Sequence, residues 1–449
     1  MDFDAIVIGA GPAGTLAAKE LARAGRSVGL FDASERERLS LPIIIEAERS
    51  VFAAVGTRPP QGDEIPYHAS IIRVFSPRGR EAFVVRGHDA VALRMDQFCR
   101  RLTDEAEAAG AKFFGGLRAL EPIVRGEAVR GAVFEHNGAR EEVTARVTID
   151  ATGNTARLAR RLAALGIDFV EEPTDRVTAA NFFHTIDPAA AAEAVKHGSA
   201  ADGEIWNRLG MHGNYSTVYS FLDLKAGRAY ILIGHRADYP NPPMAELIEG
   251  FRAEAGYYRD RLFGGGGMIR VRRSLDRMVT DGFMAVGEAA STVIPMHGSG
   301  VASAMLTGWK AGQVAAEAVG FGRADTLSLW PYAAWYQRGR GSILAGQDAS
   351  RRIVGSLSRD HLRAMVEDGG MQMEDLANAL APRSPTISAE TVPARLKSVL
   401  KNPGLAGPLG RTAWSVKTAE RHYQKYPKEW NEEDFDIWRT GAEKIFRGR

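Results

Sequence analysis

Residues 4–14 read Asp-Ala-Ile-Val-Ile-Gly-Ala-Gly-Pro-Ala-Gly, a short apolar run that leads into the spacing G-x-G-x-x-G. The pattern predicts a buried strand over residues 4–8, a small-residue helix over 15–24 and a second strand over 27–31 that ends at Asp32. In such a unit Gly9 makes a tight turn, Gly11 lets the backbone approach a pyrophosphate and Gly14 lets the helix pack against the strand. The start of the helix offers free N–H groups to phosphates, and Asp32 is placed to accept a hydrogen bond from a ribose hydroxyl. We therefore predict a dinucleotide-binding unit, with a plain glycine-rich turn as the alternative.

Length and composition narrow the class of protein. The 449 residues suggest two or three domains, and the sums of 57 basic and 55 acidic residues leave a net charge of +2, which is too balanced for nucleic-acid binding. The single cysteine, Cys99, excludes an internal disulfide framework and a cysteine-rich zinc site, and we predict no metal site. No basic leader and no long apolar run is evident, so we expect a cytoplasmic protein.

The pattern along the chain predicts an α/β fold with three regions. Residues 1–175 and 276–325 would form a discontinuous Rossmann-like dinucleotide-binding domain, and residues 176–275, rich in strand patterns, a separate sheet domain for the substrate. Residues 94–111 predict an amphipathic helix, 283–286 a buried strand, 301–319 a small-residue helix and 264–267 a turn. Residues 326–449 predict a helical carboxyl-terminal region.

Three further motifs extend the dinucleotide signal. Arg-Met-Asp-Gln-Phe at 94–98 heads a helix, Asp-Ala-Thr-Gly at 150–153 ends a strand, and residues 274–290 read Ser-Leu-Asp-Arg-Met-Val-Thr-Asp-Gly-Phe-Met-Ala-Val-Gly-Glu-Ala-Ala, followed by Pro-Met-His-Gly-Ser-Gly-Val at 295–301. In this order the motifs resemble those of group A flavoproteins, and are closest in character to the geranylgeranyl reductase family of FAD-dependent oxidoreductases. Aromatic hydroxylases and flavin-dependent halogenases share the superfamily.

The resemblance implies FAD as the cofactor and assigns roles by position. Arg94 would touch the FAD backbone, Glu288 would supply a carboxylate near the ribityl or pyrophosphate group, and Gly298 and Gly300 would bring a helix amino terminus under the pyrimidine edge of the flavin, where its dipole stabilises negative charge. The full predicted set of cofactor-binding residues is Gly9, Gly11, Pro12, Ala13, Gly14, Asp32, Arg94, Gly153, Gly287, Glu288, Gly298, Ser299, Gly300 and Val301.

The chain departs from the family at several positions. The family usually has aspartate where this chain has Glu288, and a cysteine- and glycine-rich loop where residues 41–49 read Leu-Pro-Ile-Ile-Ile-Glu-Ala-Glu-Arg. The aromatic substrate motif of the family is only approximated by residues 217–222, and a halogenase Trp-x-Trp signature is absent. These gaps leave the prenyl substrate open and count against halogenation.

Candidate catalytic residues are His297, Tyr219 and Glu46. His297 sits in the loop expected beside the flavin and could move a proton, although a loop histidine bonded to backbone is the alternative. Tyr219 could line the substrate pocket or simply pack in its strand. Glu46, with Glu48, could contact substrate or donate a proton, although a solvated helix face would explain both residues.

The reaction expected from the resemblance is reduction of a carbon–carbon double bond of an apolar small molecule by hydride transfer from reduced flavin. The alternative is a flavin monooxygenase that hydroxylates or epoxidises an aromatic or olefinic compound; a non-catalytic flavin protein is a third hypothesis. No second dinucleotide-binding unit is evident, so we expect electrons from a transient visit by NAD(P)H or from an electron-donor protein.

The carboxyl-terminal region carries Trp330, Trp335, Trp414, Trp430 and Trp438, and residues 395–428 mix many bases with few acids. Such a helix could lie on an anionic membrane surface. We favour the alternative, in which these helices cover the catalytic domain and bury their tryptophans, because residues 429–436 restore acidic charge.

Overall fold

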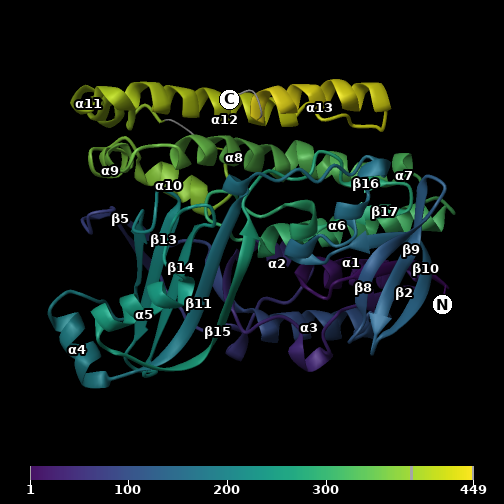
Figure 1. Cartoon of the computed structure of the whole chain (residues 1–449), viewed down its shortest axis with the longest axis horizontal. Coiled ribbons are helices and arrows are strands. Elements are labelled where there is room, and N and C mark those ends of the chain that lie inside the picture. Colours follow the sequence, from purple (N-terminus) through teal and green to yellow (C-terminus); the bar gives the residue numbers. More distant parts are fainter. Residues whose placement is uncertain (1, 385–387, 447–449) are drawn as a thin grey trace.

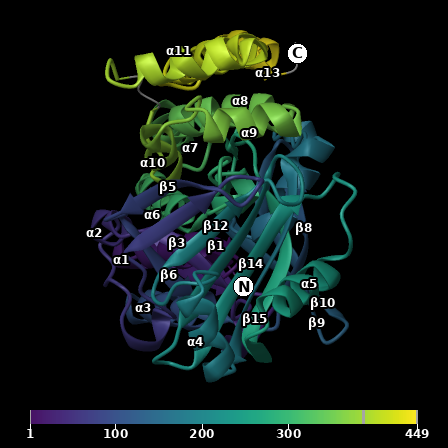
Figure 2. The same ribbon diagram turned by 90° about the vertical axis from the view of Figure 1, so that its left-hand side faces the viewer.

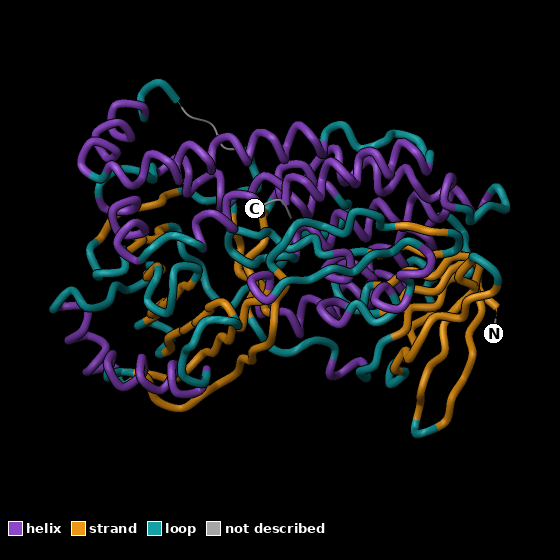
Figure 3. Tube along the Cα trace, turned by 45° about the horizontal axis from the view of Figure 1, so that its top comes forward, coloured by secondary structure: helices purple, strands orange, loops and turns teal. Residues whose placement is uncertain are grey.

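A computed structural model of the chain describes residues 2–384 and 388–446. Two sheets lie next to each other, and helices form two layers over both of them (Figures 1 and 3). None of the helices in the described part of the chain is long and apolar enough to cross a membrane.

The first sheet holds the dinucleotide-binding unit and confirms the Rossmann-like fold class. Its central strands run in the order β17-β10-β1-β2-β7 and are parallel. Helix α1 (Pro12–Arg23) makes the crossover between β1 and β2, and α3 (Met95–Ala108) and α6 (Val301–Gly320) pack beside it. The strands are β1 (Asp2–Ile8), β2 (Val28–Phe31), β7 (Lys112–Phe114), β8 (Arg118–Arg125), β9 (Ala128–His136), β10 (Ala139–Asp150), β16 (Val279–Thr280) and β17 (Phe283–Ala285).

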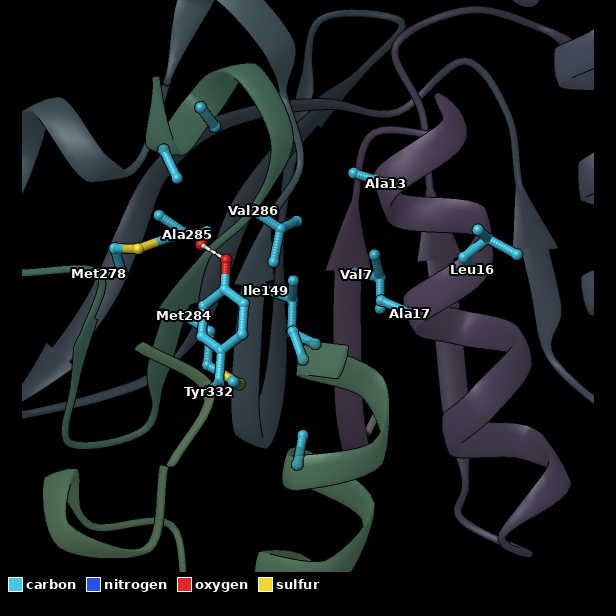
Figure 4. Packing of buried hydrophobic residues seen from close by; sticks show 14 of the residues in the cluster. Val7, Ala13, Leu16, Ala17, Ile149, Met278, Met284, Ala285, Val286 and Tyr332 are labelled. Atoms are coloured by element: carbon cyan, nitrogen blue, oxygen red, sulfur yellow. Dashed lines mark hydrogen bonds between the residues drawn. The ribbon is translucent and has the colours of Figure 1, made fainter. Parts of the chain in front are cut away.

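Small residues allow α1 to pack closely against β1 and α6 (Figure 4). Ala13 and Ala17 of α1 are buried, and a methyl group on Gly308 of α6 would lie 1.9 Å from the carbonyl oxygen of Ala13. On the far side, the hydroxyl of Tyr332 donates to the carbonyl of Ala285 at 2.8 Å. The glycine on α6 therefore lets α6 approach the backbone of the helix that follows the phosphate-binding turn.

We expect Gly308→Ala to destabilise the protein by about 1–3 kcal/mol, the usual cost of overpacking. The melting temperature in thermal unfolding measures this loss of stability. Gly410→Ala is the matched control, because a methyl group there meets no described atom within 4 Å. Equal melting temperatures for the two variants would contradict the close contact between α1 and α6.

The second sheet has the order β15-β11-β14-β13-β12-β4-β5, and the helices α4 (Pro188–Lys196) and α5 (Met244–Ala255) pack on its outer face. Only the β12–β4 pair is parallel among its described pairings. Two of its strands come from before residue 176. The strands are β4 (Ile71–Phe75), β5 (Glu81–Arg86), β11 (Arg176–Ile186), β12 (Ile205–Leu209), β13 (Ser216–Asp223), β14 (Arg228–Arg236) and β15 (Tyr258–Arg270).

The turn predicted at residues 264–267 is wrong, because the glycines lie inside β15. They pair with β11, where a methyl group on Gly266 would lie 2.7 Å from the carbonyl oxygen of Ala179. Gly264 has φ +140°, a conformation that L side chains rarely adopt. The glycines here serve close strand packing rather than a chain reversal.

The carboxyl-terminal helices form the two layers over the sheets (Figures 1 and 2). Trp330 of α7 is buried and stacks on Tyr426 at 5.1 Å, and Trp438 is buried too, so burial of the tryptophans is confirmed for these two. It is wrong for Trp335 and Trp414, whose exposed fractions are 38% and 64%. The helices are α7 (Thr326–Tyr336), a π-helical turn (Gln337–Gly341), α8 (Ser342–Gly355), α9 (Arg359–Glu367), α10 (Met373–Leu380), α11 (Val392–Lys401), α12 (Ala406–Tyr423) and α13 (Glu432–Phe446).

A buried ionic cluster joins α8 to the rest of the chain. Arg351 bonds Asp348 at 2.6 Å and Asp175 at 2.8 Å, and Arg352 bonds Asp175 at 2.9 Å. Burial alone would raise the pKa of Asp348, but the two arginines hold it well below its ordinary value. Since removing one member would leave a buried charge without compensation, the cluster fixes α8 on the segment that precedes β11.

Candidate cofactor and substrate site

The glycine turn after β1 is shaped for a phosphate group. Gly9 has φ +108°, and a methyl group there would lie 2.2 Å from the carbonyl oxygen of Ala151; a methyl group on Gly14 would lie 1.8 Å from the carbonyl oxygen of Gly9. At Gly11, in contrast, a methyl group meets no described atom within 4 Å. Gly11 precedes the first turn of α1, and Pro12 opens that turn. The space that Gly11 leaves therefore faces the N–H groups of a helix amino terminus, as a pyrophosphate requires.

Asp32, at the end of β2, holds the same turn. Its carboxylate accepts the N–H of Ala10 and the N–H of Ser34, both at 2.8 Å. Each oxygen retains capacity for a further hydrogen bond. The predicted ribose contact is thus compatible with a second task, which is to fix the glycine turn.

Two other turns close on the glycine turn. The Asp150 carboxylate accepts four hydrogen bonds, from the backbone and hydroxyl of Thr152 and from the N–H groups of Leu158 and Ala159, and so fixes the turn that contains Gly153. Gly287 has φ +58°, and a methyl group there would lie 2.9 Å from the Cβ of Ala13. The three motifs therefore meet in space although they are more than 130 residues apart in sequence.

Glu288 lies partly buried beside a fully buried arginine that the sequence analysis missed. Its Oε1 accepts the N–H of Arg270 at 3.2 Å, and the guanidinium of Arg270 donates back to the Glu288 carbonyl at 3.0 Å. Burial raises the pKa of Glu288, and Arg270 partly offsets that shift. The sequence held one signal for a basic partner of Glu288, namely the three arginines within residues 270–273 at the end of a strand.

Replacing Glu288 separates its two tasks. If the carboxylate also contacts FAD, Glu288→Ala weakens FAD binding by about 1–3 kcal/mol, the cost of leaving a polar partner without its bond. Glu288→Asp keeps the charge and has a milder effect. Flavin titration of the apo-protein measures this, with thermal unfolding of the same apo-protein as control. Unchanged affinity with lowered stability would assign Glu288 to Arg270 alone.

The loop before α6 places another helix amino terminus at the site. Gly298 has φ +81°, Gly300 caps α6, and Val301 is its first, buried residue. Ser299 donates its hydroxyl to the carbonyl of Glu46, so the loop lies directly against β3 (Ile44–Glu48). His297 is exposed, and its Nδ1 accepts the Ser299 N–H at 3.4 Å. That contact is the backbone-bonded alternative considered for His297, and a catalytic role for it stays a prediction.

β3 and β6 (Ala90–Arg94) form a small two-stranded sheet that links the two large ones. The side-chain amide of Asn181 on β11 accepts the N–H of Ile44 at 2.9 Å and donates to its carbonyl at 3.1 Å. Arg94, at the end of β6, pairs with Asp96 at 3.0 Å and lies over the ring of Phe263, 4.5 Å from its centroid. The predicted contact of Arg94 with FAD therefore starts from a guanidinium that is already oriented by protein groups.

Glu46 faces the inner side of the second sheet. It lies on a strand, so the helix-face explanation is wrong, and the alternation along β3 puts Glu46 on the same side as Ile44, whose side chain packs with the inner face of that sheet. The hydroxyl of Tyr67 donates to Glu46 Oε1 at 3.0 Å. Desolvation raises the pKa of Glu46, while His88 and the Tyr67 hydrogen bond act in the opposite direction.

Aromatic rings surround this carboxyl group. Tyr67 stacks on Phe221 with centroids 4.6 Å apart, and Tyr230 lies 5.5 Å from Tyr67. Burial and the nearby Glu46 raise the pKa of Tyr219, so its hydroxyl stays protonated. We call this group the aromatic wall; it comprises Tyr67, Phe183, Tyr219, Phe221, Tyr230 and Phe263, which pack in one apolar cluster.

Glu48 has a different environment on the same strand. It pairs with Arg340 at 2.9 Å, and Arg340 also donates to the Ser303 hydroxyl in the first turn of α6 at 2.8 Å. Arg340 therefore joins the π-helical turn to Glu48 of β3 and to Ser303 of α6, and Glu48 is held in an ion pair. Sequence alone could not separate Glu46 from Glu48, because their different partners, Tyr67 and Arg340, lie 21 and 292 residues away along the chain.

The fold and these turns define an FAD-dependent oxidoreductase. No family model matches the chain. It is 24% identical over 453 residues to a digeranylgeranylglycerophospholipid reductase of Sulfolobus acidocaldarius, covering 99% of this chain and 97% of that protein. A second protein of that name, from Methanoculleus marisnigri, is 29% identical over 82% of this chain and 90% of its own length. The resemblance to the geranylgeranyl reductase family of FAD-dependent oxidoreductases is therefore confirmed.

Solved structures agree on the fold. A geranylgeranyl bacteriochlorophyll reductase-like protein from Thermoplasma acidophilum superposes with a TM-score of 0.72 at 20% identity, covering 92% of this chain and 99% of that one. A myxobacterial chondrochloren halogenase superposes with a TM-score of 0.61 at 14% identity, covering 98% and 97%. Since reductases and halogenases share the architecture, the reaction has to be argued from the site.

Proposed function

We propose that this protein reduces carbon–carbon double bonds in the apolar chain of a prenyl lipid, with FAD as its cofactor. The observation that carries the proposal is the Glu46 carboxyl group, held by Tyr67 against an apolar aromatic wall next to the amino terminus of α6. The names of the relatives, which are reductases of digeranylgeranyl lipids, support the same substrate class.

The residues present fit FAD. The open space at Gly11 and the start of α1 suit the pyrophosphate, Asp32 the ribose, and the loop of Gly298, Ser299 and Gly300 the flavin. When bound, FAD supplies the hydride for the reduction. The protein positions the cofactor and stabilises charge on it through the dipole of α6.

Glu46 is the proton donor in this proposal. Hydride addition to one carbon of a double bond leaves the other carbon in need of a proton. Tyr67 donates to Oε1, so Oε2 is the oxygen that carries the acid proton toward the substrate. The raised pKa keeps the group protonated at a higher pH than an ordinary glutamate.

The aromatic wall selects an apolar substrate. Its rings present carbon surface and bury large area, and its tyrosine hydroxyls remain neutral because burial raises their pKa values. A polar substrate would lose hydration there without compensation. An unsaturated hydrocarbon chain has no polar groups whose hydration would be lost there.

A flavin monooxygenase is the second candidate, because structures of that class share the fold. A protonated carboxyl group beside the aromatic wall has a direct task in reduction, whereas oxygen transfer does not require a proton donor on the substrate carbon. Electrons would come from NAD(P)H or from an electron-donor protein; stopped-flow mixing with each source would identify the donor.

An anaerobic single-turnover experiment decides between the reactions. FAD-loaded protein is reduced with dithionite and mixed, without oxygen, with a geranylgeranyl lipid dispersed in detergent. We expect the oxidised flavin absorbance to return and the product to gain the mass of H₂, while the fully saturated analogue has no effect. Reoxidation that requires oxygen and yields an oxygenated product would establish the monooxygenase instead.

A further inference from the structure

Helices α11 and α12 present an unusual outward face. They form, with α13, the outermost layer of the molecule in both perpendicular views (Figures 1 and 2). Leu396 and Leu400, one turn apart on α11, are 59% and 80% exposed, and Trp414 on α12 is 64% exposed. These three side chains are among the five most exposed large apolar residues of the described part of the chain.

Cations alternate with these apolar side chains. Each exposed leucine of α11 is followed by an exposed lysine, namely Lys397 and Lys401, and the Lys401 ammonium group also pairs with Asp368 at 3.4 Å. Glu420 is the one acidic residue in the sequence from 391 to 428, and burial raises its pKa, which favours the neutral form. The exposed bases of the two helices and the turn after them are Lys397, Lys401, Arg411, Lys417, Arg421, Lys425 and Lys428.

The neighbouring α13 has the opposite character. Its first turns expose Glu432, Glu433, Asp434 and Asp436. The charge of the outer layer is therefore divided, with the positive part on α11 and α12. The division is a property of the surface, since the chain as a whole carries a net charge of only +2.

We propose that the outward face of α11 and α12 lies on the surface of a bilayer that contains anionic lipids. In that position the leucines and Trp414 enter the interfacial region, and the lysines and arginines extend to the headgroup phosphates. The proposal rests on the proposed function, because a lipid substrate must leave a membrane to reach the aromatic wall.

This face lies close to the route that a lipid would take from a bilayer to the aromatic wall. Arg395 of α11 pairs with Asp375 of α10 at 2.9 Å and donates to the Gly370 carbonyl at 3.1 Å. Leu376 of α10 packs against the apolar cluster of the aromatic wall. A lipid chain leaving the bilayer at α11 would thus be separated by one helix, α10, from the aromatic wall.

A protein partner fits this face less well. The centre of a protein interface is depleted of charged residues, whereas here every exposed leucine has a lysine beside it. Two copies related by a two-fold axis through this face would bring cations against cations. A bilayer satisfies both kinds of side chain at once.

Vesicle co-sedimentation with the full-length, FAD-loaded protein tests the proposal. We expect binding to phosphatidylcholine vesicles enriched in phosphatidylglycerol, little binding to phosphatidylcholine alone, and release at high salt. Lys417→Gln with Arg421→Gln should weaken binding by about fivefold per charge removed. Leu396→Ser with Leu400→Ser should weaken it by at least about tenfold.

Matched controls remove equivalent groups elsewhere. Lys225→Gln with Lys444→Gln deletes two exposed charges, and Ile437→Ser deletes an apolar side chain that is 67% exposed on α13; both should bind as the parent protein does. The proposal is overturned if the parent protein stays in the supernatant, or if test and control variants lose binding equally. Self-association without lipid that Leu396→Ser with Leu400→Ser abolishes would overturn it in favour of an interface between copies.

Turnover of detergent-dispersed lipid keeps this result separate from the proposed function. All surface variants should turn over dispersed substrate at the parental rate, because none of them lies in the site. Absence of turnover in the parent protein, with vesicle binding intact, would refute the reductase and leave the bilayer contact standing.

Discussion

A protein with valine in place of Gly11 should fold and fail to retain FAD. Gly11 has φ −76°, which any L residue adopts, and a side chain there meets no described atom, so the apo-protein tolerates the change. The new side chain would occupy the space in front of the first turn of α1. Losing two charge-assisted hydrogen bonds to a pyrophosphate costs about 3–6 kcal/mol, which is about a hundredfold or more in Kd.

Flavin retained through purification and a titration of the apo-protein measure this effect. Gly250→Val is the matched control, because Gly250 is exposed on α5 and a methyl group there also meets no described atom within 4 Å. Gly14→Val is unsuitable, since a methyl group at Gly14 would lie 1.8 Å from backbone and would disturb the fold itself. A Gly11→Val protein with full FAD content would refute the cofactor site.

The second large effect concerns Glu46. Glu46→Gln removes the acid without changing its size, and we expect the substrate half-reaction to slow by about 10²–10⁴-fold while the flavin stays bound. A loss below about threefold would exclude Glu46 as the proton donor. Tyr219→Phe tests the competing assignment, because its hydroxyl is the other candidate beside the wall.

The pH profile gives a readout that a structural role would not move. Glu46 must be protonated to act, so the rate falls as pH rises through its pKa, which desolvation places above the ordinary value of a glutamate. The Tyr67 hydrogen bond stabilises the charged form and lowers that pKa. Tyr67→Phe should therefore move the falling limb to higher pH, and Glu46→Gln should abolish it.

The local motifs of the cofactor site could be predicted from sequence alone. The strand, glycine turn and helix of residues 4–24 form one short window, and the glycine spacing reflects contacts within that window, such as the close approach of Gly14 to the carbonyl of Gly9. The Asp150 turn and the start of α6 at Val301 were predictable for the same reason. In each case the information lies in residues that are neighbours in the chain.

The substrate side was decided by tertiary structure. Tyr67 lies 21 residues from Glu46 in an irregular segment without periodicity, and Asn181 binds Ile44 across 137 residues. The glycines at 264–267 look like a turn in sequence and form a strand because β11 accepts them at close distance. A short window cannot contain such pairings, because burial and hydrogen bonding between distant segments determine them. The sequence by itself therefore determined the glycine turn, the Asp150 turn and the start of α6. Only the packing of β3 and of the segment around Tyr67 against the second sheet brought Glu46, Tyr67 and the aromatic wall together.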